Sequence, residues 1–154
     1  NFNISVPNVH TFLKRYMTAG SFLPYQCRLA YCLCDRILLE TDFLKYKSSL
    51  ISTSIVSLIR CYFNLSEFTP MLYKYTGYKR CNLTQCITSI QNCLKKEQEQ
   101  VIRDKDKDEN YYIPGTSVRI KYTDFLYQNL VKLKLPSDSN FNSNSNSNSN
   151  VTPN

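Results

Sequence analysis

Apolar side chains recur at helical spacing along most of this chain, most strongly over residues 48–63, SSLISTSIVSLIRCYF, where the first charge is Arg60. The large apolar residues cover more than half of a helical circumference, and small hydroxyl residues fill the rest. Such hydroxyls can donate to the carbonyl four residues earlier, so burying them costs little. A strand is the alternative, but the run is too long and its period is not two. We predict a buried central helix here, with Ser48 or Ser49 as its N-cap.

Four further segments carry patterns that predict helices packed around this centre. The first covers residues 8–19, with Pro7 placed for a first turn and Gly20 for a C-terminal cap. The second covers residues 24–40, is apolar around much of its surface, and is followed by a linker at 41–47. A short helix at 69–76 has Thr69 as its cap, Pro70 in its first position and Gly77 beyond its end. The last, at 80–97, is apolar along one face only.

The remainder of the chain is less regular. From residue 98 to 122 the pattern gives way to charge, a turn at Pro114 and Gly115, and a short extended stretch. Thr123 or Asp124 can cap an extra helix over residues 123–133. Residues 136–154 are rich in Asn and Ser and are predicted to be disordered. We therefore predict an all-α domain over residues 1–133, a five-helix bundle in which four helices pack around the central one at about 48–63.

Composition agrees with a single domain. The chain has 154 residues and is 42% hydrophobic, which is enough for one core. It begins with Asn rather than Met, as a piece of a longer protein would. Its apolar runs fall short of the roughly 20 residues of a membrane span, and it opens without the pattern of a signal peptide. We expect a soluble intracellular protein that does not contact a membrane.

Candidate chemistry is sparse in this sequence. The seven cysteines form no CxxC pair, and His10 is the only histidine, so zinc-finger spacing cannot be assembled. Most of the cysteines fall in helical apolar patterns, where a reduced thiol acts as a small hydrophobe. The three glycines are isolated and form no phosphate-binding loop. We predict no enzyme activity, no metal site and no cofactor.

The charge of the chain is a weak signal. A net charge of +7 permits a nucleic-acid partner, but the 19 basic residues are scattered along the sequence. The densest charged run, residues 95–109, alternates in sign, which is typical of a solvated helix end and loop. Nucleic-acid binding is therefore not the expected function.

Particular segments resemble the C-terminal half of A- and B-type cyclins. FLKYKSSLISTSIVSLIRCYF (residues 43–63) is similar to that family's YLKYPPSLIAASALYLA, and FTPMLYKYTGY (residues 68–78) to its WTPTLxxYTGY. FNISVPNVHTFLKRY, at residues 2–16, resembles the family's entry to this half, and residues 102–117 resemble its IRxKYxxxKYxGVS tail. The positions that carry the motifs are Pro7, Phe12, Leu13, Leu44, Lys45, Tyr46, Ser49, Ile55, Thr69, Pro70, Tyr75, Thr76, Gly77 and Tyr78.

The resemblance implies the cyclin-box fold and a role as regulatory subunit of a cyclin-dependent protein kinase, in nucleus and cytoplasm, by binding without catalysis. The chain departs from the pattern at Lys47 and Ser48, where prolines are usual, at Asp106, which replaces an aromatic residue, and at Phe68, which replaces a tryptophan. The kinase-binding helices of the family lie in an N-terminal box that this sequence does not include. Two alternatives remain: a transcription or nucleic-acid-binding module like transcription factor IIB, and an interaction domain without kinase binding.

Overall fold

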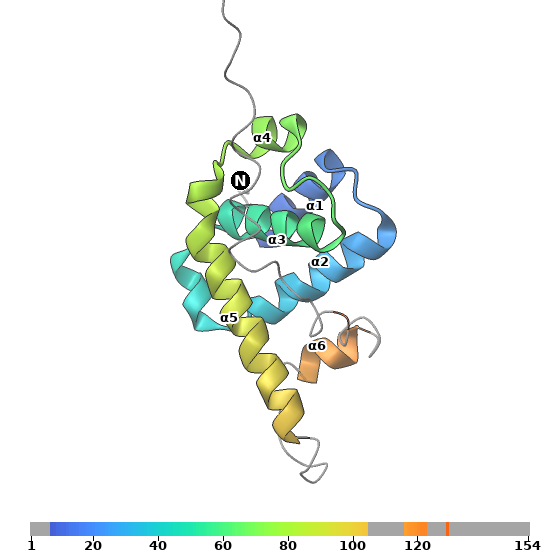
Figure 1. Ribbon diagram of the computed structural model, residues 1–154, viewed down its shortest axis with the longest axis vertical. Coiled ribbons are helices and arrows are strands. Elements are labelled where there is room, and N and C mark those ends of the chain that lie inside the picture. Colours follow the sequence, from blue (N-terminus) through green and yellow to red (C-terminus); the bar gives the residue numbers. More distant parts are fainter. Residues whose placement is uncertain (1–6, 105–115, 123–128, 130–154) are drawn as a thin grey trace, which may run out of the picture.

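The structure is a computed structural model that describes residues 7–104, 116–122 and 129. Within these residues every regular element is a helix (Figure 1), which confirms the predicted all-α class. In chain order the elements are α1 Val9–Ala19, α2 Pro24–Ile37, the 3-10 helix η1 Thr41–Lys45, α3 Ser48–Tyr62, α4 Pro70–Thr76, α5 Arg80–Asp104 and α6 Thr116–Lys121. None of the described helices is both long enough and apolar enough to cross a membrane.

Helix α3 is the centre of the bundle, as the sequence predicts. It contacts α1, α2 and α5, and all ten residues from 51 to 60 are buried. Its hydroxyls are satisfied locally: Thr53 donates to the carbonyl of Ser49 at 2.8 Å. Ser52 donates both to Ser48, one turn back, and to the carbonyl of Val9 in α1, at 2.8 Å each. The small side chains therefore let α1 approach closely and bond to α3.

The start of α3 differs from the prediction. Lys47 occupies the N-cap position, without a side-chain hydrogen bond, and both Ser48 and Ser49 lie within the helix. The hydroxyl of Ser49 is instead 2.8 Å from that of Tyr78, so it is not available to cap the helix. A tertiary contact has overridden the local capping preference of serine.

Two boundaries near the N-terminus also differ. Asn8 caps α1, accepting a hydrogen bond from the backbone of Thr11 at 2.9 Å, so Pro7 lies outside the helix rather than in its first turn. Gly20 does follow α1 as its C-terminal cap. Helix α2 ends at Ile37, three residues before the predicted boundary, because the chain turns into η1 where a featureless linker was expected.

The short helix α4 begins and ends as its sequence indicates. The side chain of Thr69 accepts from the backbone of Leu72 at 3.2 Å, and Pro70 stands in the first turn. Gly77 has a φ of 68°, the left-handed conformation that glycine adopts without strain. This turn separates α4 from α5 and redirects the chain along the bundle.

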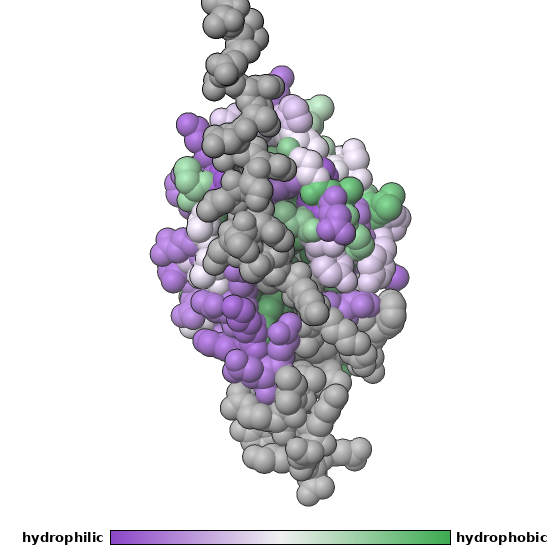
Figure 2. All heavy atoms as spheres, in the orientation of Figure 1, coloured by the Kyte–Doolittle hydropathy of each residue, from purple (hydrophilic) through white to green (hydrophobic). Residues whose placement is uncertain are grey.

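Helix α5 continues to Asp104, seven residues beyond the predicted end at residue 97. Glu97 itself is buried and paired with Arg36 of α2. Hydrophilic side chains gather over its exposed middle part (Figure 2). Residues 116–121 form α6, where an extended stretch was predicted. The extra helix over 123–133 and the disordered tail at 136–154 fall outside the described residues, apart from residue 129.

Candidate functional site

The family-motif positions fall into two groups in the structure. Leu13 and Ile55 are fully buried in the core, and Phe12 packs against it. Pro7, Leu44, Lys45, Pro70, Tyr75 and Gly77 are exposed. Leu44 is the extreme case, with 84% of its surface accessible. The sequence pattern therefore mixes residues that hold the fold with residues that are open to partners.

Hydrogen bonds join several motif positions to other helices. The hydroxyl of Tyr46 lies 2.9 Å from that of Ser89 in α5 and donates to the carbonyl of Gln85 at 3.4 Å. The ammonium group of Lys45 lies 5.1 Å from the centre of the Tyr46 ring, in reach of a cation–π contact. Tyr46 thus joins the end of η1 to α5, and the bond between Ser49 and Tyr78 joins the start of α3 to the turn before α5.

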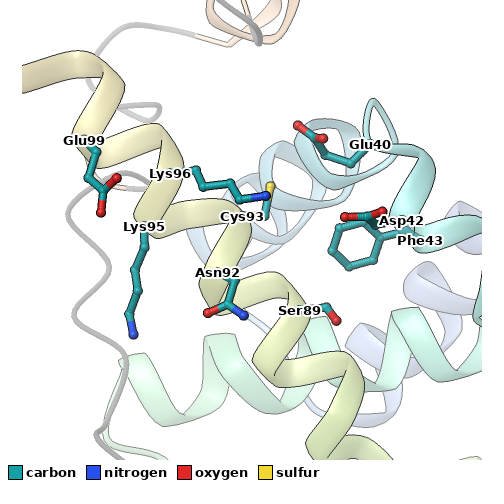
Figure 3. Close-up of a pocket in the computed structure, with 9 residues that line it drawn as sticks. All are labelled: Glu40, Asp42, Phe43, Ser89, Asn92, Cys93, Lys95, Lys96 and Glu99. Carbon is teal, nitrogen blue, oxygen red and sulfur yellow. The ribbon is translucent and has the colours of Figure 1, made fainter. Parts of the chain in front are cut away.

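A hollow of about 360 Å³ lies beside η1, between the end of α2 and the middle of α5 (Figure 3). Its buried floor includes Phe43 and Cys93. Acidic Glu40 and Asp42 stand on the η1 side, and Lys96 reaches in from α5 (Figure 3). Ser89, Asn92, Lys95 and Glu99 complete the lining. The hollow therefore combines a small apolar floor with walls of opposite charge.

This hollow is poorly suited to catalysis. Burial raises the pKa of the Cys93 thiol, which keeps it in its unreactive protonated form. The lining contains no histidine to act as a base. The hydroxyl of Ser89 is already engaged by Tyr46. Because an activated nucleophile needs a base in reach, these residues fit binding better than covalent chemistry.

A buried ion pair lies next to the hollow. Nε and Nη2 of Arg36 in α2 lie 2.6 and 2.5 Å from Oε2 of Glu97 in α5. Nη1 of Arg36 also donates to Glu40 at 2.9 Å. Burial alone would lower the pKa of Arg36, but the hydrogen bonds to the two carboxylates outweigh it and leave that pKa raised. The pair fixes how α5 lies against α2, and so sets the shape of the hollow.

A second polar cluster forms around Asp35 on α2. One carboxylate oxygen of Asp35 lies 2.7 Å from Nε2 of His10 in α1. The other accepts from Lys121 at 2.6 Å and from the hydroxyl of Tyr122 at 2.8 Å. Partial burial raises the pKa of Asp35, but these hydrogen bonds outweigh it and hold that pKa below its usual range. The carboxylate thus joins α1, α2 and the end of α6.

The same cluster has the elements of a metal site. Donor atoms of His10, Cys34 and Asp35 lie within 4.8 Å of one another. Both oxygens of Asp35 already accept hydrogen bonds, one of them from an ammonium group. Burial, reinforced by the neighbouring Asp35 carboxylate, raises the pKa of the Cys34 thiol to about 12, which opposes the thiolate that a metal would require. The arrangement fits a hydrogen-bonded contact between helices better than a cation site.

Sequence reasoning missed both clusters. Arg36 and Glu97 are 61 residues apart, and Asp35 and Tyr122 are 87 residues apart, so no local spacing connects them. The available signal was an arginine within an otherwise apolar helical stripe. Such a charge needs a partner when it is buried, and the partner has to come from another helix.

The protein is an all-helical bundle with a buried third helix, and its sequence matches a known family. Residues 7–113 match the family model described as "Cyclin, C-terminal domain". The chain belongs to the cyclin family. The resemblance read from the motifs is thereby confirmed, and so is the cyclin-box fold. Cyclins are regulatory rather than catalytic proteins and act in general with cyclin-dependent kinases, which is consistent with the expectation of no enzyme activity.

Curated cyclins are similar over much of this chain. The G2/mitotic-specific cyclin-B3 of Mus musculus is 24% identical over 115 residues, covering 73% of the chain and 8% of the relative. Cyclin-A1 of Xenopus laevis is 30% identical over 114 residues, covering 71% and 27%. The G2/mitotic-specific cyclin-A of Hydra viridissima is 32% identical over 93 residues, covering 58% and 22%. The chain thus spans less than a third of the length of these relatives. No solved structure gives a significant match.

Proposed function

We propose that this chain is the C-terminal half of a cyclin that regulates a cyclin-dependent protein kinase during cell division. The observation that carries the proposal is the family match over residues 7–113, together with relatives named as A- and B3-type cyclins, two of them G2/mitotic-specific. The proposed action is binding without chemistry. A cyclin holds a helix and the activation loop of the kinase in their active arrangement.

Within that proposal, this half supports a preceding cyclin box, which makes the principal kinase contacts. The rigid features of the bundle suit such a role. Arg60 of α3 donates to the carbonyls of Ser66 at 2.6 Å and Gly20 at 2.8 Å. The buried guanidinium therefore ties the α1–α2 and α3–α4 loops to the central helix, so that both loops keep a fixed surface. We place the working protein in the nucleus and cytoplasm, away from membranes.

The test compares this chain with a longer product that includes the coding sequence upstream of it. Each is mixed with a purified cyclin-dependent kinase, and complex formation and phosphorylation of a generic substrate are measured. The longer product should bind and activate the kinase, whereas residues 1–154 alone should bind weakly and activate little. The longer product carrying Ile55→Asp, which disrupts the second half only, should lose much of the activation.

Binding to duplex DNA tests the alternative, a nucleic-acid function. Both proteins are assayed for binding to duplex DNA at low and at physiological salt. Non-specific binding through scattered lysines should collapse as salt rises, because it depends on counterion release. A longer product that activates no kinase, while holding a particular duplex tightly at physiological salt, would replace the kinase proposal with a nucleic-acid function.

A further inference from the structure

Acidic residues are scarce at one end of the described bundle, where Glu67 is paired with Arg80. Residues 68–96 include five lysines and arginines but no Asp or Glu, and α1 is likewise free of acids. Helix α4 packs against α1, and it lies at the opposite end of the bundle from the C-terminal half of α5 (Figure 1). The described acidic residues belong to α2, the turn between α2 and η1, η1 itself, the loop before α4, and α5 from residue 97 onward. The α4 end is therefore electropositive.

Helix α4 exposes a compact group of side chains at this end. Leu72 is buried and anchors the helix to the core. Met71 and Tyr75 are one turn apart on the flank of the helix next to Leu72, and 52% and 53% of their surfaces are accessible. Lys74 is exposed and lies three residues after Met71, so it borders Met71 on the solvent side of the helix. Exposed Lys79 follows the Gly77 turn. We call Met71, Lys74, Tyr75 and Lys79 the α4 face.

The two lysines of the α4 face have charges that are not paired within the part of the chain that the structure describes. Neither Lys74 nor Lys79 forms an ion pair with any residue that the structure describes. The acid that precedes α4, Glu67, is taken by Arg80 and by the hydroxyl of Ser57, the latter at 2.6 Å. An acidic partner would therefore meet two cations without displacing an ion pair between described residues.

We propose that the α4 face is a docking site for an acidic peptide segment of a partner protein, with an apolar side chain of that segment packed on Met71 and Tyr75. Exposed tyrosine and methionine are typical of protein interfaces, since a large adaptable apolar surface is buried on contact. The two lysines select acidic flanks on either side of the apolar contact and speed the encounter. The inference does not depend on kinase regulation, because the surface lies within this chain alone.

The chemistry favours a peptide over the other anionic partners. A duplex bound through phosphates needs a track of many cations to hold at physiological salt, and the α4 face has two. A membrane surface favours a long amphipathic helix with a broad apolar side, whereas α4 has seven residues. A short acidic segment with one apolar anchor matches both the size and the charge of the face.

The test uses a fluorescein-labelled peptide in which a Leu-Phe pair is flanked by Asp and Glu. Its binding to the 154-residue chain is measured by fluorescence anisotropy. A matched peptide with Asn and Gln at the acidic positions reports the charge dependence. Lys74→Glu and Lys79→Glu together should weaken binding about tenfold, and Tyr75→Ala should weaken it about threefold with the charge intact. Arg28→Glu on α2 makes the same charge change as either single lysine variant and should leave affinity within about twofold, because distant charges are screened.

Every variant is first checked for an unchanged melting temperature, so that a folding defect is not taken for lost binding. The proposal is overturned if the acidic peptide does not bind, or if Arg28→Glu weakens it as much as Lys74→Glu does. It is also overturned if duplex DNA or phosphatidylserine vesicles bind more tightly than the peptide and lose binding with the same lysine variants. Kinase activation plays no part in these measurements, so their outcome is separate from that of the proposed function.

Discussion

Arg36 has only 3% of its side chain exposed, and its main partner Glu97 has 1%. Removing two charges from water costs several kcal/mol per ion, and their attraction offsets this only when both partners are present. The pair is therefore better regarded as a device that fixes the position of α5 on α2 than as a source of net stability.

We predict that Glu97→Ala destabilises the fold by about 3–5 kcal/mol, because the guanidinium is left buried without its main partner. The double variant Arg36→Met/Glu97→Leu should cost clearly less, since no charge remains to be desolvated. Urea unfolding of the two variants and the parent measures the difference. A single variant as stable as the parent would mean that water reaches Arg36.

At the same scale, Asp35 predicts a pH dependence. Its pKa in the folded state lies below its unfolded value of about 3.9. Its stabilising contribution is therefore complete above the unfolded pKa and is lost as pH falls through the folded pKa. Asp35→Asn should lower the melting temperature by about 2–4 °C at pH 7.

That difference should shrink as pH falls through the folded pKa of Asp35 and vanish once the parent carboxyl is also protonated. Thermal melts of parent and variant across pH 2–7 give the comparison. A difference that stays constant over this range would show that the carboxylate charge does not contribute, and that only the shape of the side chain matters.

At the scale of elements, α3 has the strictest requirements. Ile55 is fully buried, so Ile55→Asp introduces an unpaired charge at the centre and should cost several kcal/mol, comparable to the whole stability of a domain. Leu44→Asp is the matched control, because that side chain is mostly exposed. Circular dichroism should show a cooperative melt for the control and its loss for Ile55→Asp. A normally melting Ile55→Asp protein would show that α3 is not central.

The helices that sequence predicted best are those whose signals are local. Thr69, Pro70 and Gly77 delimit α4 by capping and backbone preference, which depend on neighbours a few residues away. The apolar stripe of α3 predicted its burial for the same reason. Helix ends without a local stop signal were missed: α5 continues to Asp104, and α2 stops early where the chain turns into η1.

The candidate sites were less predictable than the fold. The motif positions were identified, but sequence could not indicate that Phe43 and Cys93 form the floor of one hollow, because these residues are 50 positions apart and η1 and α5 meet only in the folded bundle. The acid-free stretch at residues 68–96 was readable from sequence. Its meaning as a surface depended on knowing that Met71 and Tyr75 face outward while Leu72 faces inward.

At the scale of the whole molecule, the cysteines report on cooperative stability. All seven are unpaired thiols, and only Cys81 is exposed. Burial raises the pKa of Cys32 and Cys34 to about 12 and that of Cys61 to about 11. In native buffer at pH 8, iodoacetamide should label Cys81 rapidly. Cys32, Cys34, Cys86 and Cys93 should react only through unfolding.

Mass spectrometry of peptides taken over time measures the label at each cysteine. The four buried thiols should react at a common rate if the bundle unfolds as one unit. In urea their labelling rates should approach that of Cys81. Rapid native labelling of Cys86 or Cys93 would indicate that α5 opens separately from the rest.

The bonds from Asp35 to Lys121 and Tyr122 also set an order of events during protein synthesis. Their sequence separations are 86 and 87 residues. A ribosome adds roughly 5–20 residues per second, so about 4 to 17 seconds pass between the synthesis of Asp35 and that of Lys121 and Tyr122. During that interval His10 is the partner already synthesised. The nascent chain can therefore assemble α1, α2 and α3 first, and the contact with α6 closes only as translation of this domain ends.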